Sequence, residues 1–164
     1  MSRMWDGSGF FKMMAANEKA VGDLYRELAK NAKFGGKFFE NMAKDEDKHH
    51  DIYVALLHKY ENSKGLEIEI SEEQEQYLNL LIQNNMLRDP DLLIEKAKKL
   101  TIKDDVFDIA ERAERDSVLF VEELIELYPE LQPDEFKVVL KEEKAHLRMV
   151  MERRMDSQLT NLKL

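Results

Sequence analysis

The chain has no cysteine, and this absence removes several kinds of site at once. Disulfide bonds, thiolate nucleophiles, zinc–thiolate clusters and iron–sulfur clusters all need cysteine sulfur, so none can form within this chain. Any bound metal must therefore be held by oxygen and nitrogen ligands.

Residues that interrupt helices are also scarce, with 6 glycines and 3 prolines among 164 residues. Hydrophobic residues make up 43% of the chain and charged residues 36%, which is typical of a helical domain rather than of a disordered or β-rich chain. A chain of this length can bury one substantial core. We therefore predict a single all-α domain over residues 1–164.

No apolar run approaches the roughly 20 residues that a membrane-spanning helix needs, and the first residues lack the apolar core of a signal peptide. We therefore expect no membrane partner and a cytoplasmic location. Positive charge is in the minority, because 34 acidic residues against 25 lysines and arginines give a net charge of -9. Such a surface repels phosphate backbones, so we expect no nucleic-acid partner.

Apolar residues recur every three to four positions in four segments, which is the spacing of one face of a helix. We predict long helices over about 9–32, 37–60, 103–128 and 134–154. Gly35 and Gly36 separate the first two, and Pro129 and Pro133 separate the last two. Because both connections are short, each pair is predicted to form an antiparallel hairpin.

The segment 61–102 has a different character and is predicted to be a long crossover with one or two short helices. Ser71 and Gln74 have the spacing of a capping box, and a turn is predicted around Pro90. After about Arg154 the chain becomes polar, and we expect this tail to fray or to dock on a partner.

Six acidic or histidine side chains fall inside the apolar stripes and are therefore predicted to face the core. They are Glu18 on the first long helix, Glu46 and His49 on the second, Glu114 on the third, and Glu143 and His146 on the fourth. Glu46 lies 10 residues after Gly36 and Glu143 lies 10 residues after Pro133. The carboxylates are thus predicted to meet at a similar depth.

Four inward carboxylates would repel one another and lose hydration, at a cost of several kcal/mol per ion. No lysine or arginine occupies these stripes to compensate them. Two divalent cations would do so, because carboxylates and neutral imidazoles are ligands that iron and manganese accept. A metal-free structural bundle is the alternative, since one Glu-x-x-His pair is expected by composition in roughly every second such chain.

Four segments resemble the ferritin-like superfamily, in particular the rubrerythrin group: NEKAVGDLYRELA, FENMAKDEDKHHDIY, AERAERDSVLFVEEL and LKEEKAHLRMV. The resemblance implies a ferritin-like antiparallel four-helix bundle with a long crossover between the second and third helices. It also implies two iron ions, although manganese or zinc could use the same ligands. The implied terminal ligands are Glu18 and Glu114, the bridging ligands are Glu46 and Glu143, and the nitrogen ligands are His49 and His146.

Further residues match or depart from the family pattern. Tyr25 matches a tyrosine seven residues after the first glutamate, where its phenol can hydrogen-bond a ligand carboxylate. Val121 stands where the family often repeats that tyrosine. Glu111, three residues before Glu114, is a candidate for an additional or exchanging ligand.

The resemblance implies an oxidoreductase that reduces peroxide or oxygen or oxidises ferrous iron. Because the chain lacks the cysteines of a rubredoxin domain, electrons are expected from an external donor protein. A homodimer is also expected. Iron binding or storage without turnover is the alternative from a different functional class.

Overall fold

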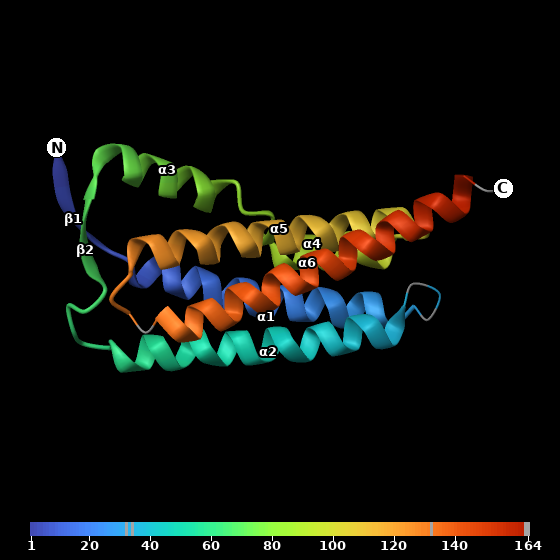
Figure 1. Ribbon diagram of the computed structural model, residues 1–164, viewed down its shortest axis with the longest axis horizontal. Coiled ribbons are helices and arrows are strands. Elements are labelled where there is room, and N and C mark those ends of the chain that lie inside the picture. Colours follow the sequence, from blue (N-terminus) through green and yellow to red (C-terminus); the bar gives the residue numbers. More distant parts are fainter. Residues whose placement is uncertain (32, 34, 132, 163–164) are drawn as a thin grey trace.

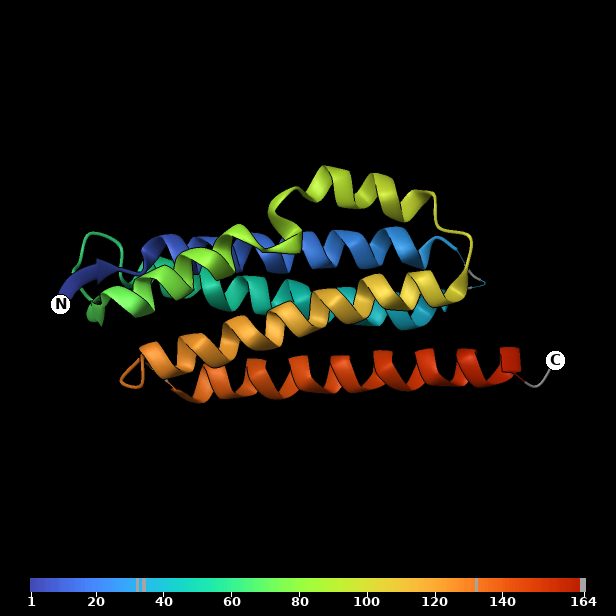
Figure 2. The same cartoon turned by 90° about the horizontal axis from the view of Figure 1, so that it is seen from above.

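The described residues form four long helices. These helices lie side by side along the molecule (Figures 1 and 2). The computed structural model describes residues 1–31, 33, 35–131 and 133–162. In chain order its elements are β1 (Ser2–Asp6), α1 (Ser8–Ala29), α2 (Gly36–Lys59), β2 (Glu67–Ser71), α3 (Glu72–Gln83), the 3-10 helix η2 (Met86–Arg88), α4 (Pro90–Lys98), α5 (Lys103–Leu127) and α6 (Pro133–Leu162). The predicted end of the first helix at residue 32, and residues 163–164 of the expected domain, lie outside the described residues.

The described residues are mostly helical, which confirms the predicted all-α class. α1 packs along α2, and α5 packs along α6, with the partners in each pair running in opposite directions (Figure 1). The first pair is joined at Gly35, whose φ of 87° is a left-handed conformation that glycine adopts without strain. Within the described residues, no helix is long and apolar enough to cross a membrane.

The segment between α2 and α5 returns along the length of the molecule through α3 and α4 (Figure 2). Ser71 caps α3 as predicted: its Oγ accepts from the Gln74 backbone at 3.1 Å, and its own N–H donates to the Gln74 side chain at 2.9 Å. Near the middle of the segment, the buried Asn85 side chain donates to Asn17 of α1 at 2.9 Å. This contact attaches the segment to the first helix pair.

A two-stranded antiparallel ribbon was not predicted. β1 pairs with β2 in a register that places Trp5 opposite Ile68 and Arg3 opposite Ile70. Isoleucine and glutamate alternate in β2, which is the period of a strand with one buried face. The side chain of Ile70 is accordingly only 2% exposed.

Of the two possibilities expected for the tail after about Arg154, fraying was wrong, because α6 continues to Leu162, and docking on a partner stays a prediction. The Arg154 guanidinium lies between two carboxylates of the first turns of α5, with Nε 3.0 Å from Asp104 Oδ1 and Nη1 2.9 Å from Asp108 Oδ1. Gln158 donates to Asp104 at 3.0 Å one turn later. These contacts hold the end of α6 against α5.

Two apolar clusters fill the interior. The Phe107 cluster includes Leu24, Tyr25, Phe39, Phe107 and Val150, and the Phe136 cluster includes Phe11, Tyr53, Val121, Leu124 and Phe136. Every long helix contributes to both clusters, and on every long helix the predicted acidic and histidine residues lie between the two contributions. A polar layer is therefore enclosed between two apolar ones.

Candidate metal centre

The polar layer contains all six side chains that the sequence predicts to face inward. Glu18 comes from α1, Glu46 and His49 from α2, Glu114 from α5, and Glu143 and His146 from α6. Each of these side chains is buried, and none of the residues is more than 2% exposed. The apolar residues one turn before and after them on each helix direct them into the core.

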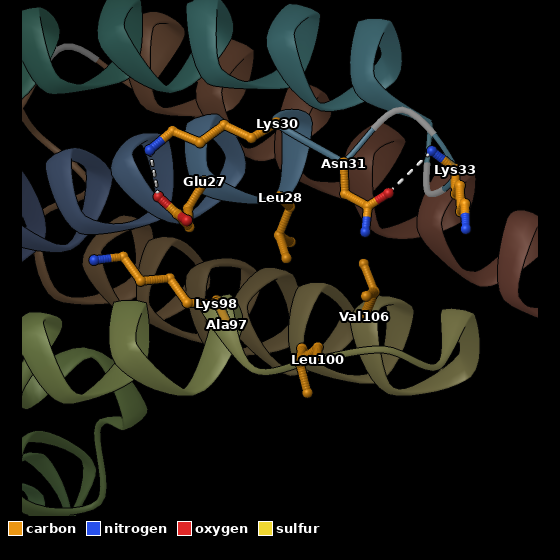
Figure 3. Close-up of a pocket in the computed structure, with 9 residues that line it drawn as sticks. All are labelled: Glu27, Leu28, Lys30, Asn31, Lys33, Ala97, Lys98, Leu100 and Val106. Atoms are coloured by element: carbon orange, nitrogen blue, oxygen red, sulfur yellow. Dashed lines mark hydrogen bonds and ion pairs between the residues drawn. The ribbon is translucent and has the colours of Figure 1, made fainter.

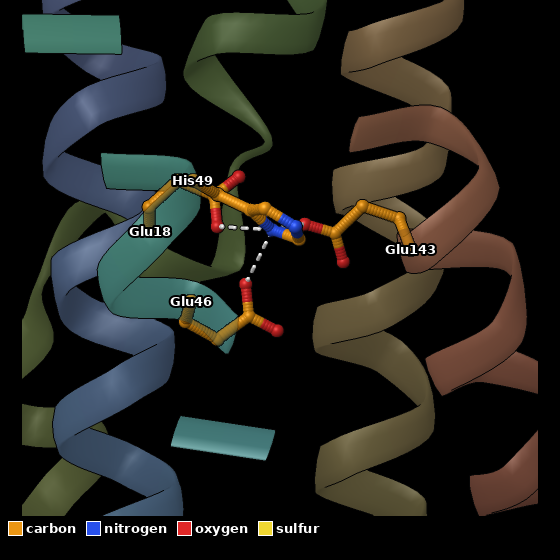
Figure 4. Close-up of side chains that lie close together, drawn as sticks. All are labelled: Glu18, Glu46, His49 and Glu143. Carbon is orange, nitrogen blue, oxygen red and sulfur yellow. Dashed lines mark hydrogen bonds and ion pairs between the residues drawn. The ribbon is translucent and has the colours of Figure 1, made fainter. Parts of the chain in front are cut away.

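The six residues form two overlapping groups of potential ligands. One group is Glu18, Glu46, His49 and Glu143, and the other is Glu46, Glu114, Glu143 and His146. Within each group the ligand atoms lie within 4.8 Å of one another. Figure 4 shows the first group, in which three carboxylates surround the ring of His49.

Glu46 and Glu143 belong to both groups because each directs its two oxygens to different histidines. Glu46 places Oε2 3.3 Å from His49 Nδ1 and Oε1 3.0 Å from His146 Nδ1. Glu143 places Oε1 2.9 Å from His49 Nδ1 and Oε2 3.7 Å from His146 Nδ1. This is the arrangement expected of carboxylates that bridge two cations.

Glu18 and Glu114 instead lie at the two sides of the layer. Glu18 Oε2 is 3.6 Å from His49 Nδ1, and Glu114 Oε1 is 3.6 Å from His146 Nδ1. Each therefore faces a single histidine, as a terminal ligand would. The layer consequently has approximate two-fold symmetry, with one half of its ligands from each helix pair.

Concentrating carboxylates in this layer alters their protonation. Burial raises the pKa of Glu18 well above its ordinary value, and the charges of Glu143 and Glu46 raise it further. Burial raises the pKa of Glu114 to about 8, with a further contribution from Glu143. Without a cation, the layer must therefore take up protons near neutral pH.

Both ring nitrogens of each histidine face carboxyl groups, and a neutral imidazole cannot satisfy both while these groups are ionised. His49 Nδ1 faces the layer while its Nε2 lies 2.6 Å from Glu142, and His146 Nε2 lies 3.1 Å from Asp45. A neutral ring has one N–H and one lone pair, so one of its nitrogens would meet an acceptor without a proton. Burial lowers the pKa of both histidines, but hydrogen bonds with the layer carboxylates outweigh burial and raise it.

Unpaired oxygen atoms indicate what the layer is suited to hold. Among the described residues, Glu18, Glu114 and Glu143 each have a buried Oε2 atom without a hydrogen-bond partner. Unpaired buried acceptors are costly, and a cation would satisfy them. It would also accept the Nδ1 lone pair of each histidine while Nε2–H donates outward. Four carboxylates and two imidazoles thus fit two cations such as iron, manganese or zinc.

Asp45 and Glu142, which contact the outer nitrogens of the histidines, were not predicted from the sequence. Their side chains are 39% and 43% exposed, and each belongs to the opposite helix pair from the histidine that it contacts. A carboxylate on the far nitrogen fixes the tautomer and orientation of a metal-bound imidazole. The available signal was their position, because each directly precedes the glutamate of a Glu-x-x-His motif.

Removing either outer carboxylate should weaken the binding of one cation. We expect Glu142→Ala to lower zinc affinity on the His49 side and Asp45→Ala on the His146 side, each by about 10- to 100-fold, because the ring loses its partner. Isothermal titration of the metal-free protein with Zn²⁺ measures both effects. Glu152→Ala, an exposed glutamate of α6, is the matched control. Unchanged affinities in Glu142→Ala and Asp45→Ala would show that these carboxylates do not orient the rings.

The other predicted residues have different environments. The Tyr25 hydroxyl is buried and donates to Glu114 Oε1, a carboxylate of the layer, and its role beside a metal ligand stays a prediction. Glu111 lies outside both groups, with its carboxylate 3.3 Å from Arg115 and 3.6 Å from Arg154. Ligation by Glu111 would require exchange of these partners, so that role stays a prediction.

A surface pocket near the end of α1 is separate from the polar layer. Figure 3 shows its lining, which comes from the C-terminal part of α1, from α4 and from the start of α5. Lys30 and Lys98 border it but have acidic partners, at 2.8 Å from Glu27 and 3.1 Å from Glu95. This pocket shares no residue with either ligand group, so we assign it no part in metal binding.

Comparison with known proteins agrees with this geometry. A family model described as rubrerythrin matches residues 10–153, a range that contains every residue of both ligand groups. Comparisons with curated proteins and with solved structures gave no match. Because the matched range covers most of the chain, the chain belongs to the rubrerythrin family.

Proposed function

We propose that this protein is a rubrerythrin-like oxidoreductase whose ferritin-like four-helix bundle holds two iron ions. In this proposal Glu46 and Glu143 bridge the ions, and each ion has one further glutamate and one histidine. The segment between α2 and α5 is the crossover of such a bundle. The physiological reaction is reduction of peroxide or oxygen, or oxidation of ferrous iron.

The observation that carries the proposal is the sharing of two carboxylates between two ligand groups. Glu46 and Glu143 each lie against both His49 and His146, at distances of 2.9 to 3.7 Å. A single-ion site would not need this duplication. A structural bundle would not need it either, because apolar residues would fill the same space without leaving oxygens unpaired.

Paired iron ions bound here would supply two electrons to one oxidant molecule. Reduction of hydrogen peroxide to two waters consumes two electrons and two protons, and the electrons would come from an external donor protein. Asp45 and Glu142 extend from the outer nitrogens of the buried histidines to the surface, where their carboxylates can exchange protons with solvent. The two apolar clusters limit access of bulk water to the polar layer.

The test compares the wild-type protein with Glu46→Ala/Glu143→Ala after anaerobic purification. Elemental analysis should give about two irons per wild-type chain, and its near-ultraviolet absorption should change on addition of peroxide. The variant should lose both properties. Glu40→Ala/Glu152→Ala, which removes one exposed glutamate from each of the same helices, is the control.

Other outcomes separate the alternatives. Bound iron whose absorption does not respond to peroxide or oxygen would favour iron storage without turnover. A wild-type chain that is purified without metal and does not bind added iron would leave only a structural bundle. Zinc in the purified protein would point to adventitious binding, since zinc has no redox chemistry.

A further inference from the structure

Tyr53 has a buried hydroxyl group that nothing in the proposed function explains. It lies on α2, four residues after His49, and its side chain is fully enclosed in the Phe136 cluster. Within the described part of the chain this hydroxyl has no hydrogen-bond partner. Burial of an unpaired hydroxyl costs stability, and phenylalanine would pack equally well without that cost.

The position of Tyr53 is best understood through the approximate symmetry of the polar layer. On one side, Tyr25 of α1 donates to Glu114 of α5. The symmetry-related position on α5 is Val121, which cannot donate to Glu18 of α1. Tyr53 and Val121 pack in the same apolar cluster, so the side that lacks a phenol on α5 has one on α2.

On the other side of the layer, the tyrosine and the valine occupy the opposite positions. Val150 lies four residues after His146, as Tyr53 lies four residues after His49. Val150 packs in the Phe107 cluster with Tyr25. At these two pairs of related positions, each side of the layer thus has one tyrosine and one valine, and only the helix that supplies the phenol differs.

The side with Tyr53 also has an unsatisfied acceptor. Glu18 Oε2 is buried, and among the described residues it has no hydrogen-bond partner. Its separation from His49 Nδ1, 3.6 Å, is beyond a hydrogen bond. Glu18 faces His49 of α2, and Tyr53 lies one turn after His49 on the same face of that helix, so the two groups lie on the same side of the layer. In keeping with this placement, burial and then the charge of Glu18 raise the pKa of the Tyr53 phenol.

We propose that Tyr53 is a positioning residue for Glu18: its hydroxyl donates to the Glu18 carboxylate and holds it on its cation, as Tyr25 holds Glu114. The inference rests on the proposed metal centre. The two cations would then differ in the tyrosine that holds their terminal glutamate. Tyr25 comes from α1, whereas Tyr53 comes from α2, the helix that also carries a Glu-x-x-His motif. Hydrogen bonds to ligands of this kind are worth about 10- to 100-fold in metal affinity.

The test is titration of the metal-free protein with Co²⁺, followed by visible absorption and by calorimetry. We expect Tyr53→Phe to weaken one of the two cobalt sites by about 10- to 100-fold and Tyr25→Phe to weaken the other. In Tyr53→Phe/Glu18→Gln the loss should be no greater than in Glu18→Gln alone, because both changes remove the same interaction. Tyr77→Phe, a half-exposed tyrosine of α3, is the matched control.

A second measurement separates positioning from packing. In chelator, Tyr53→Phe should leave the midpoint of thermal unfolding unchanged or raise it, since the hydroxyl is unpaired there, whereas Tyr25→Phe should lower it. If the wild-type chain binds two cobalt ions and Tyr53→Phe weakens neither site, or weakens both equally, the role of Tyr53 is overturned while the proposed metal centre is retained. A wild-type chain that binds no cobalt would overturn both.

Discussion

In the presence of a chelator, the protein is expected to lose stability as the pH rises from about 4.5 to 8, and binding of Zn²⁺ should reverse this trend. Burial raises the pKa of Glu114 from 4.5 to about 8, so in this window the folded chain keeps a proton that the unfolded chain releases. The raised pKa values of His49 and His146 act in the same direction above about pH 6.5. Each proton held only by the folded chain costs up to about 1.4 kcal/mol per pH unit.

Bound cations replace these protons. Because the ligands lose their protons as the pH rises, the affinity of the layer for cations increases with pH. At a free Zn²⁺ concentration of about 100 times the dissociation constant, each ion adds about 2.7 kcal/mol to the free energy of unfolding. Chemical unfolding at pH 5.5, 6.5 and 7.5 measures how the free energy of unfolding changes with pH, once with chelator and once with Zn²⁺. The Asp104–Arg154 pair does not interfere, because its hydrogen bond lowers the Asp104 pKa below 3.8 and its contribution is lost only in stronger acid.

Glu114→Gln is the control for this experiment, since it keeps the shape of the side chain and removes the titrating group. In chelator it should remove the Glu114 contribution to the pH dependence, leaving that of the histidines, and raise the free energy of unfolding at pH 7.5 by at least about 1 kcal/mol. A wild-type protein whose stability is constant or increases from pH 5.5 to 7.5 in chelator would contradict the assigned protonation of the layer.

The helical parts of the fold and the polar layer were accessible from sequence because they depend on periodicity. Glu18 and Glu114 stand out only because apolar residues surround them at helical spacing. Asp45 and Glu142 were missed for the converse reason. They lie about 100° from the inward stripe, where a carboxylate has the pattern of a solvated helix face, and only the packing of α2 near α6 brings them to a histidine.

The remaining differences also arise from contacts between distant segments. Nothing local specifies that β1 pairs with β2, where Ser2 donates to Glu69, a residue 67 positions later in the chain. The length of α6 likewise depends on a contact with another helix, that of Arg154 with Asp104 of α5. Tyr53 has the spacing of an ordinary core aromatic. Its significance emerges only when its unpaired hydroxyl is set beside the unpaired oxygen of Glu18.

The two kinds of glutamate in the layer should respond differently to an isosteric substitution. Glu46→Gln or Glu143→Gln is expected to abolish binding of both cations, because each carboxylate offers an oxygen to both ligand groups. Glu18→Gln or Glu114→Gln removes a carboxylate that belongs to only one ligand group, and each should abolish the binding of one cation. Metal per chain after gel filtration in stoichiometric Zn²⁺ would then fall to about zero in the first two variants and to about one in the others.

This pattern tests the geometry rather than the total charge of the layer. All four substitutions remove one negative charge from a buried site, so a layer that attracts cations only by its overall charge would lose metal to the same extent in each variant. Far-ultraviolet circular dichroism establishes that the helices remain folded. Equal loss of metal in all four variants would contradict the bridging assignment of Glu46 and Glu143. Loss of two cations in the Glu46 and Glu143 variants, against one in the Glu18 and Glu114 variants, follows only if Glu46 and Glu143 are shared.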